Sequence, residues 1–302
     1  MVKNLVLENV SVGFKLPQGV FYAVDDVSLS LPGGNFTAII GESGCGKSVL
    51  GQAILNILPS GVIKKGRVLY NGEHVEKILS AFGIIPQNPS ESLNPVRKIG
   101  KQMQDILAVH NIVDSSNSYK KQCLRLFGLQ EAERVLAAYP HELSGGMLQR
   151  VLCAMAVSSK PEWILADEPT KGLDEQVGAV VRKNLLTIKQ DLHLSMLIIT
   201  HDIALAQEVC DDVLVMYAGQ VLEHNADIWH KPLHPYTKGF LQALPKNGLQ
   251  VIPGKAPVPG ESFTGCKFAT RCPYCKTRCK EEKPAMQQVG DAEVRCFLYA
   301  EG

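Results

Sequence analysis

The sequence predicts an α/β fold with a mostly parallel sheet, a small antiparallel β region and an inserted helical region. First, short apolar strands alternate with amphipathic helices along most of the chain, a pattern typical of parallel sheets covered on both faces. Second, the glycine-rich segment GESGCGKS directly follows one such strand and opens a helix. Third, five of the nine cysteines crowd the end of the chain, which indicates a short Cys-rich metal-binding domain there.

Composition indicates a globular protein and excludes some functions. The chain has 302 residues, of which 45% are hydrophobic and 20% are charged, enough for a sizeable core. Its net charge of +1 gives no support to nucleic-acid binding. No apolar run is long enough to cross a bilayer, and the start MVKNLVLENV alternates like a strand. We therefore expect mature cytosolic sequence from the first residue.

Each element follows from a local pattern. LVLENVSVGF and AVDDVSLSL alternate as strands, the turn Pro32–Gly34 follows them, and GRVLYNGEHV is a strand with an Asn71-Gly72 turn. Helical periodicity dominates residues 90–160. NFTAII, WILADE and SMLIIT are short buried strands, with helices around VGAVVRKNLLTIKQ and IALAQEVC and a hairpin in DVLVMYAGQVLEHN. We expect a first domain over 1–230, with a helical subdomain at about 90–160, and an extension over 231–302 that has one short helix, then the Pro/Gly-rich linker IPGKAPVPG and the cysteine tail.

The segment GESGCGKS fits the P-loop pattern G-x-x-x-x-G-K-[ST] and predicts a P-loop NTPase core. Its glycines allow backbone N–H groups to surround phosphate oxygens, and the helix N-terminus adds positive charge. Lys47 is expected to reach the β- and γ-phosphates of ATP, and the Ser48 hydroxyl to bind Mg²⁺. The alternative is a strand-to-helix turn without a ligand. The nucleotide-binding candidates are Gly41, Glu42, Ser43, Gly44, Cys45, Gly46, Lys47 and Ser48.

Further polar residues follow other strands. Asp167 and Glu168 end WILADE, Gln87 follows a short apolar run, and His201 follows LIIT. Ligands bind at the carboxyl ends of strands in open α/β sheets, so these side chains are expected to meet one nucleotide. Asp167 suits a water-mediated Mg²⁺ contact, and Glu168 suits a general base for the attacking water. The alternative for the two acids is a helix cap.

A second glycine-rich segment, LSGGMLQR, lies about a hundred residues after the first and has no lysine. Ser144 can cap the helix that follows, and Gly145 and Gly146 leave N–H groups open to an anion. We interpret it as binding the phosphate of another subunit's ATP, in a two-fold, self-complementary dimer. The alternative is a capped helix without a ligand.

These motifs together resemble the nucleotide-binding subunit of ATP-binding-cassette transporters, over roughly residues 3–230. The resemblance implies that Phe14 stacks on adenine, with Phe21 and Tyr22 as alternatives. It also implies that Gln87 senses the metal and water, that Glu168 is the catalytic base and that His201 contacts the γ-phosphate. Asp174 lies in the loop that crosses the dimer, although Lys171-Gly172 departs from the family's usual residues there.

Other stretches resemble the dipeptide, oligopeptide and nickel uptake branch, namely QNPSESLNPV, YPHELSGGMLQRV, LHPYTKGFLQALP and GCKFATRCP. The resemblance implies an importer ATPase on the cytoplasmic face of the membrane. Its expected partners are a second cassette subunit, identical or homologous, two transmembrane permease subunits contacted by residues 88–96 and, indirectly, an extracytoplasmic substrate-binding protein. The alternative from another class is a soluble cassette ATPase that acts on ribosomes or nucleic acid.

The cysteine tail suggests a metal centre. The spacing of Cys266, Cys272, Cys279 and Cys296 matches the branch's four-cysteine pattern, and the resemblance implies a [4Fe–4S] cluster held by these thiolates. Zn²⁺ is one alternative, because Cys272 and Cys275 form a C-x-x-C pair, and free or disulfide-bonded cysteines are the other. Cys275 is an additional cysteine that could replace a ligand or stay free. We expect His224, His230 and His234 to have no ligand role.

Overall fold

The structure is a computed structural model that describes residues 3–17, 19–77, 79–173, 175–245, 248–258, 261 and 263–300. One sheet within this part is antiparallel, in the order β2-β1-β4-β5. Its strands are β1 (Leu5–Leu16), β2 (Gly19–Leu31), β4 (Ile63–Tyr70) and β5 (Glu73–His74). Leu5 and Leu7 are buried on one face of β1, as the period of two requires. Asn9, at φ 50, interrupts the register between Leu7 and Val10.

The second sheet carries the site, and in the described residues its order is β11-β12-β10-β9-β3-β8-β7-β6. The strands β9, β3, β8, β7 and β6 are parallel neighbours. Their bounds are Asp212–Tyr217, Phe36–Ile40, Ser195–Ile199, Trp163–Asp167 and Phe82–Ile85. This arrangement confirms the predicted α/β core and its antiparallel β region.

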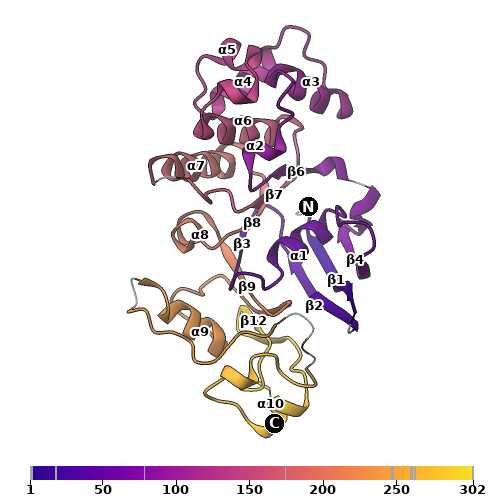
Figure 1. Ribbon diagram of the computed structural model, residues 1–302, viewed down its shortest axis with the longest axis vertical. Coiled ribbons are helices and arrows are strands. Elements are labelled where there is room, and N and C mark those ends of the chain that lie inside the picture. The colour runs from indigo at the N-terminus through magenta and orange to yellow at the C-terminus, as the bar shows by residue number, and fades with distance from the viewer. Residues whose placement is uncertain are drawn as a thin grey trace.

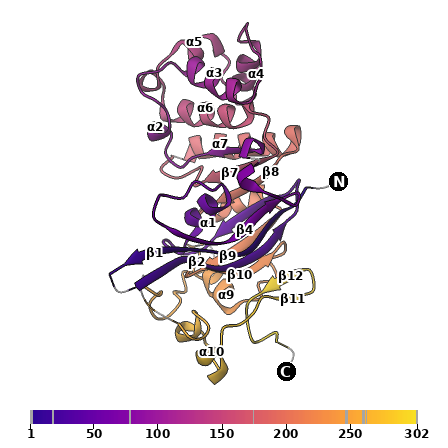
Figure 2. The ribbon, with the colours of Figure 1, turned by 90° about the vertical axis from the view of Figure 1, so that its right-hand side faces the viewer.

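The two faces of the parallel sheet pack against different layers (Figure 2). On one face, Ile164 and Ile198 pack against α6 (Gly145–Ser158), α7 (Glu175–Thr187) and α8 (Ile203–Val209). On the other face, Leu165 and Leu197 pack against α1 (Lys47–Ile54) and the antiparallel sheet. Strand residues that alternate in direction thus bury both faces, which explains why the strands are apolar throughout.

A group of helices forms one end of the molecule (Figure 1). It comprises α2 (Pro89–Ser92), α3 (Ile99–Val109), α4 (Ser118–Leu126), α5 (Ala132–Ala137) and α6. Apolar side chains of these helices, including Met103 and Leu124, join the core beneath α6. The second glycine-rich segment, Leu143 to Met147, which we call the signature segment, therefore opens the helix that connects this group to the parallel sheet.

The C-terminal extension lies at the opposite end (Figure 1). It contains α9 (Pro235–Gln242), a 3₁₀ turn (Ala269–Arg271), α10 (Thr277–Glu281), β11 (Gln287–Val289) and β12 (Ala292–Val294). β12 pairs with β10 (Gln220–Asn225), and Phe268 is buried beside Tyr236 and Tyr217. The extension thus continues the main sheet, which the sequence patterns did not predict. No helix of the described ranges has both the length and the apolar character needed to span a bilayer.

Candidate functional site

The phosphate loop connects β3 to α1 in a conformation that needs glycine. Gly41 has φ 150 and Gly46 has φ 106. A Cβ atom at Gly41 would lie 2.2 Å from the Met216 carbonyl oxygen, and one at Gly46 would lie 2.1 Å from the Ala23 carbonyl oxygen. Neighbouring backbone therefore lies too close to Gly41 and Gly46 to leave room for a side chain, and only glycine fits at both positions.

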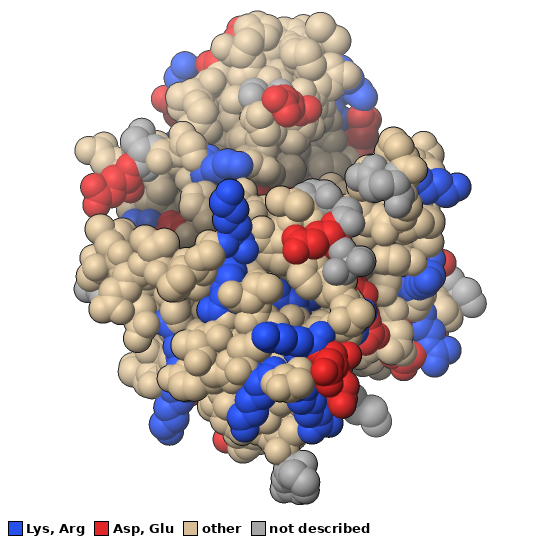
Figure 3. Space-filling view, turned by 60° about the horizontal axis from the view of Figure 1, so that its bottom comes forward, with Lys and Arg blue, Asp and Glu red and all other residues tan. Residues whose placement is uncertain are grey.

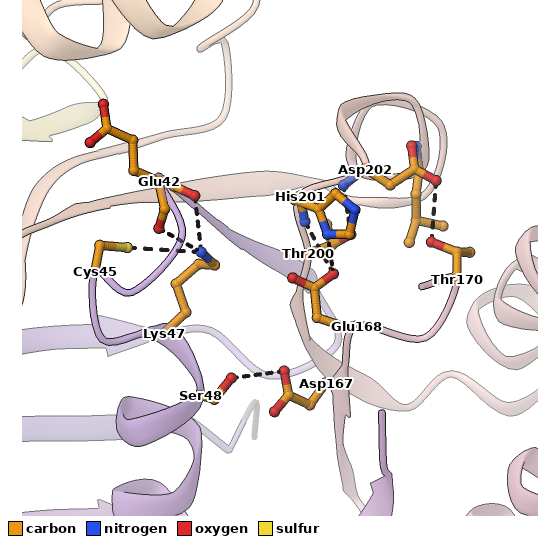
Figure 4. Close-up of polar contacts among 12 residues, drawn as sticks. Glu42, Cys45, Lys47, Ser48, Asp167, Glu168, Thr170, Thr200, His201 and Asp202 are labelled. Carbon is orange, nitrogen blue, oxygen red and sulfur yellow. Dashed lines mark hydrogen bonds and ion pairs between the residues drawn. The ribbon is translucent and has the colours of Figure 1, made fainter. Parts of the chain in front are cut away.

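Lys47 is held inside this loop (Figure 4). Its ammonium donates to the carbonyl oxygens of Gly41 at 2.9 Å and Glu42 at 3.0 Å, and lies 3.9 Å from the Cys45 sulfur. Burial, only partly offset by Lys47, raises the pKa of the Cys45 thiol, so Cys45 is a neutral packing residue. The ammonium lies where it can turn from the loop's carbonyl groups to phosphate oxygens.

Ser48 and Asp167 form a pair of oxygen ligands suited to Mg²⁺. The Ser48 hydroxyl donates to Asp167 Oδ1 at 3.1 Å. Burial, together with the charge of Glu168, raises the pKa of Asp167 despite this hydrogen bond. A divalent cation reverses such a shift because it favours the ionised carboxylate. Hydroxyl and carboxylate oxygens are also the donors that Mg²⁺ prefers, so these residues fit the metal that ATP hydrolysis requires.

Glu168 directly follows β7 and contacts His201 (Figure 4). Glu168 Oε2 lies 2.7 Å from His201 Nδ1 and accepts the His201 backbone N–H at 3.3 Å. Glu168 has φ 50, a left-handed conformation that costs a non-glycine residue about 1–2 kcal/mol. The Glu168 side chain is mostly buried, with 13% of it exposed, whereas 61% of the His201 side chain is exposed. The strained backbone thus turns a buried carboxylate toward an accessible imidazole.

Three of the four predicted strand-end residues, Gln87, Glu168 and His201, line one cavity of about 530 Å³. Asp167 is not among its described lining residues but pairs with Ser48, which is. Parallel strands β3, β8, β7 and β6 are neighbours in that order, so the residues after them share one edge of the sheet. The cavity is lined by residues from five chain segments, which include Ala23, Lys47, Ser48, Gln87, Glu168, Lys171 and His201. It has phosphate-binding donors on one wall and a carboxylate on the other, as hydrolysis of a nucleotide requires.

The signature segment lies outside this cavity. Ser144 caps α6, accepting the Met147 N–H at 3.3 Å, and both Ser144 and Gly145 are exposed. A Cβ at Gly145 would meet no atom within 4 Å. None of the residues from Leu143 to Met147 is among the described residues that line the cavity. The helix N-terminus is therefore open and does not border this cavity within the described residues.

A second cavity of about 300 Å³ adjoins the first, since Ala23 and Gly44 line both. Its walls include Phe21 and Tyr22, but not Phe14. Phe14 instead pairs with Phe21 across β1 and β2 and packs against the core. This geometry favours the alternative aromatic residues for adenine stacking, and the assignment to Phe14 stays a prediction. Asp174 lies outside the described residues.

Two contacts near Glu168 were not predicted. The buried Gln149 of α6 donates to the Pro169 carbonyl oxygen at 3.1 Å, and the Thr170 hydroxyl donates to Asp202 at 3.2 Å. Gln149 thus connects the signature helix to the residue after Glu168. Only its place within LSGGMLQR could have indicated a role, since no local pattern predicts its partner.

Four of the five tail cysteines line one small cavity. Cys266, Cys272, Cys279 and Cys296 border it together with His234, whereas Cys275 does not. His234 is buried and caps α9 by accepting the Tyr236 N–H at 3.0 Å. Among the described residues, however, no three His, Cys, Asp or Glu side chains are grouped so as to hold a metal ion. The predicted Cys-rich metal-binding domain is therefore not confirmed.

Comparison with known proteins identifies the family. Residues 24–171 match the family model of the ABC transporter, and residues 222–279 match the C-terminal region of the oligopeptide/dipeptide transporter. The dimeric structure of the cassette MJ0796, in a post-hydrolysis state bound to ADP and Pi, is 26% identical. It aligns with a TM-score of 0.63 over 73% of this chain and 97% of that chain.

Two relatives are similar over nearly their whole length. The oligopeptide transport ATP-binding protein OppD of Haemophilus influenzae is 34% identical, with 98% of each chain covered. The dipeptide transport ATP-binding protein DppD of Escherichia coli is 36% identical, with 95% of this chain and 94% of the relative covered. These matches give no support to the ribosome or nucleic-acid alternative. The chain therefore belongs to the ATP-binding cassette family, as an ATPase subunit of the oligopeptide and dipeptide transporter type that binds ATP with Mg²⁺.

Proposed function

We propose that this ATPase powers the uptake of peptides through separate transmembrane permease subunits, at the cytoplasmic face of the membrane. The observation that carries this proposal is the division of the ATP site. Lys47, Glu168 and His201 line one cavity, whereas the helix tip at Ser144 and Gly145 is exposed and is not among the described residues that line it. A second cassette, identical or homologous, completes the site.

Hydrolysis in this site proceeds through the chain's own side chains. Lys47 exchanges the carbonyl oxygens of Gly41 and Glu42 for phosphate oxygens. Ser48 and Asp167 would hold Mg²⁺, which would neutralise the charge that develops on the phosphates. Glu168 orients a water molecule and accepts its proton as the water oxygen attacks the γ-phosphorus. The bond to the β-phosphate oxygen breaks, and ADP leaves with the electron pair. His201 lies 2.7 Å from Glu168, holds that carboxylate in place and contacts the γ-phosphate. Gln87 transmits the presence of the γ-phosphate to residues 88–96.

ATP binding closes the dimer because Ser144, Gly145 and Gly146 of one subunit bind the nucleotide of the other. A closed dimer moves the permease subunits toward their outward-facing state, and hydrolysis reopens it. An extracytoplasmic substrate-binding protein delivers the cargo. Peptides are favoured over nickel because the relatives described above are named for peptide transport.

Purification of the tagged Glu168→Gln chain from solubilised membranes of its own host, with MgATP present, tests this function. We expect a second cassette and two membrane proteins to co-purify. The wild-type complex in liposomes should then show ATPase activity that rises with a peptide mixture and not with Ni²⁺. Recovery with ribosomal proteins, or recovery of the chain alone, would refute the proposal.

We propose further that Cys266, Cys272, Cys279 and Cys296 hold a soft-metal group, a [4Fe–4S] cluster rather than Zn²⁺. Backbone N–H groups of Phe268, Tyr274 and Leu298 favour the ionised sulfur of the cysteine two positions earlier, as thiolate ligands require. Burial nevertheless raises the pKa of all three thiols, so a cation is needed to ionise them. The four-cysteine spacing, which resembles that of the peptide and nickel uptake branch, favours the cluster over Zn²⁺.

Metal analysis after anaerobic purification tests this assignment. We expect about four iron and four sulfide per chain with visible absorption, lost in Cys272→Ser and retained in Cys275→Ser. One zinc per chain would establish the alternative, and a metal-free chain that folds normally would refute both.

A further inference from the structure

The C-terminal extension contacts the phosphate loop directly at Glu42. Arg271, in the 3₁₀ turn of the extension, donates from one guanidinium nitrogen to Glu42 Oε1 at 3.1 Å and Oε2 at 3.2 Å. Tyr236, in α9, accepts the Glu42 backbone N–H at its hydroxyl at 3.1 Å. The second residue of the loop is therefore bound by both its side chain and its backbone to residues about two hundred positions away.

Arg271 is built into this contact. Only 7% of its side chain is exposed, whereas other Lys and Arg side chains spread over the surface of this end of the molecule (Figure 3). Its guanidinium also donates to the Pro253 carbonyl oxygen at 3.1 Å and to the Tyr217 hydroxyl at 3.3 Å. Because a guanidinium presents its donors in a fixed plane, these partners fix the position from which Arg271 binds Glu42.

Tyr236 is equally constrained. Its side chain is fully buried, and its ring lies 4.6 Å from the Tyr217 ring and 5.5 Å from the Phe268 ring, centroid to centroid. The hydroxyl therefore cannot move without disturbing an aromatic cluster shared by the cassette and the extension. It satisfies a loop N–H group that lies away from the phosphate cavity.

The contact acts on the part of the loop that also holds Lys47. Lys47 donates to the carbonyl oxygens of Gly41 and Glu42, and the Glu42 carboxylate points away from the Lys47 ammonium (Figure 4). Gly41 in turn lies so close to the Met216 carbonyl group that a Cβ atom would clash with it. The loop is thus bound by Lys47 on its inner side and by the extension on its outer side.

We propose that Arg271 and Tyr236 are positioning residues for ATP binding, which hold the phosphate loop through Glu42. The extension does not need this ion pair to stay attached, because Lys267 pairs with Asp25 at 2.9 Å and β12 pairs with β10. Loss of Arg271 therefore frees the loop while the extension remains docked. This proposal rests on the chain's ATPase function and not on the proposed cargo or metal.

Titration of the full chain with mant-ATP and Mg²⁺ tests the proposal, together with melting temperatures. We expect Arg271→Gln to raise the Kd on the order of tenfold, since loop displacements well under 1 Å already weaken positioning. Tyr236→Phe should raise it roughly threefold by the same argument. Arg278→Gln is the matched control, because Arg278 also directly precedes a cysteine but pairs with Glu282 inside the extension.

A double-mutant cycle separates positioning from general stability. If Arg271 acts through Glu42, Glu42→Gln combined with Arg271→Gln should bind mant-ATP no more weakly than the weaker single variant. Should Arg271→Gln fail to fold, Glu42→Gln and Tyr236→Phe alone decide the question by the same Kd measurement. An unchanged Kd with a lowered melting temperature, or fully additive effects on Kd, would overturn the proposal.

Discussion

Substitution of Gly46 by alanine tests whether close backbone packing shapes the phosphate loop. The new Cβ would lie 2.1 Å from the Ala23 carbonyl oxygen, whereas real Cβ contacts stay beyond 3.0 Å. The loop and β2 would therefore have to separate by about 0.9 Å, and a displacement of about 1 Å can cost a factor of roughly 10². The φ of 106 adds about 1–2 kcal/mol of backbone strain for alanine.

Gly34→Ala is the control, because Gly34 has φ 86 and open space around its Cβ position. In thermal unfolding Gly34→Ala should lose only the stability that backbone strain costs. Gly46→Ala should lose more stability and also about 10²-fold in ATP affinity by nucleotide titration. The reasoning fails if Gly46→Ala binds ATP within about twofold of wild type while its melting temperature falls like that of Gly34→Ala.

Three further predictions follow from the site. Glu168→Gln should lower kcat by roughly 10²–10⁴-fold and leave MgATP bound, and turnover near the wild-type rate in a steady-state assay would contradict this role. Ser144→Ala should remove an N-cap worth about 1 kcal/mol and abolish ATP-dependent dimerisation but not ATP binding to the monomer, as measured by sedimentation and titration. Burial opposes the charge of His224, but Asp212 and Glu293 outweigh it and raise the pKa of His224. The stability that protonated His224 contributes should therefore be complete below about pH 6.5 and be lost as pH rises through its elevated pKa. The melting temperature of the wild type should fall over that pH range, and this fall should be smaller in His224→Gln.

The placement of the phosphate loop and of the strand-end residues was predictable because each of them has a local pattern. GESGCGKS follows a strand, and Glu168 and His201 follow apolar runs that β7 and β8 realise as parallel neighbours. Once the sheet is parallel, the common edge follows from topology alone. The helix of the signature was predictable for the same reason, since Ser144 is a strong N-cap before an apolar stretch.

The contacts of the extension were not predictable in this way. β11 and β12 have three residues each, too few for an alternating pattern to stand out. The Arg271–Glu42 pair joins residues 229 positions apart, and no spacing rule relates them. The adenine-stacking residue depends on the irregular register of β1 and β2 between Val12 and Gly13, which decides the side to which each aromatic residue turns.

The structure of the assembled transporter, trapped with MgATP by Glu168→Gln, would test the shared ATP site most directly. We predict that the Ser144 hydroxyl and the Gly145 N–H of each cassette lie about 2.7–3.2 Å from γ-phosphate oxygens of a nucleotide whose P-loop lysine belongs to the opposite cassette. Each ATP enclosed by one chain alone, with Gly145 facing solvent, would contradict this account.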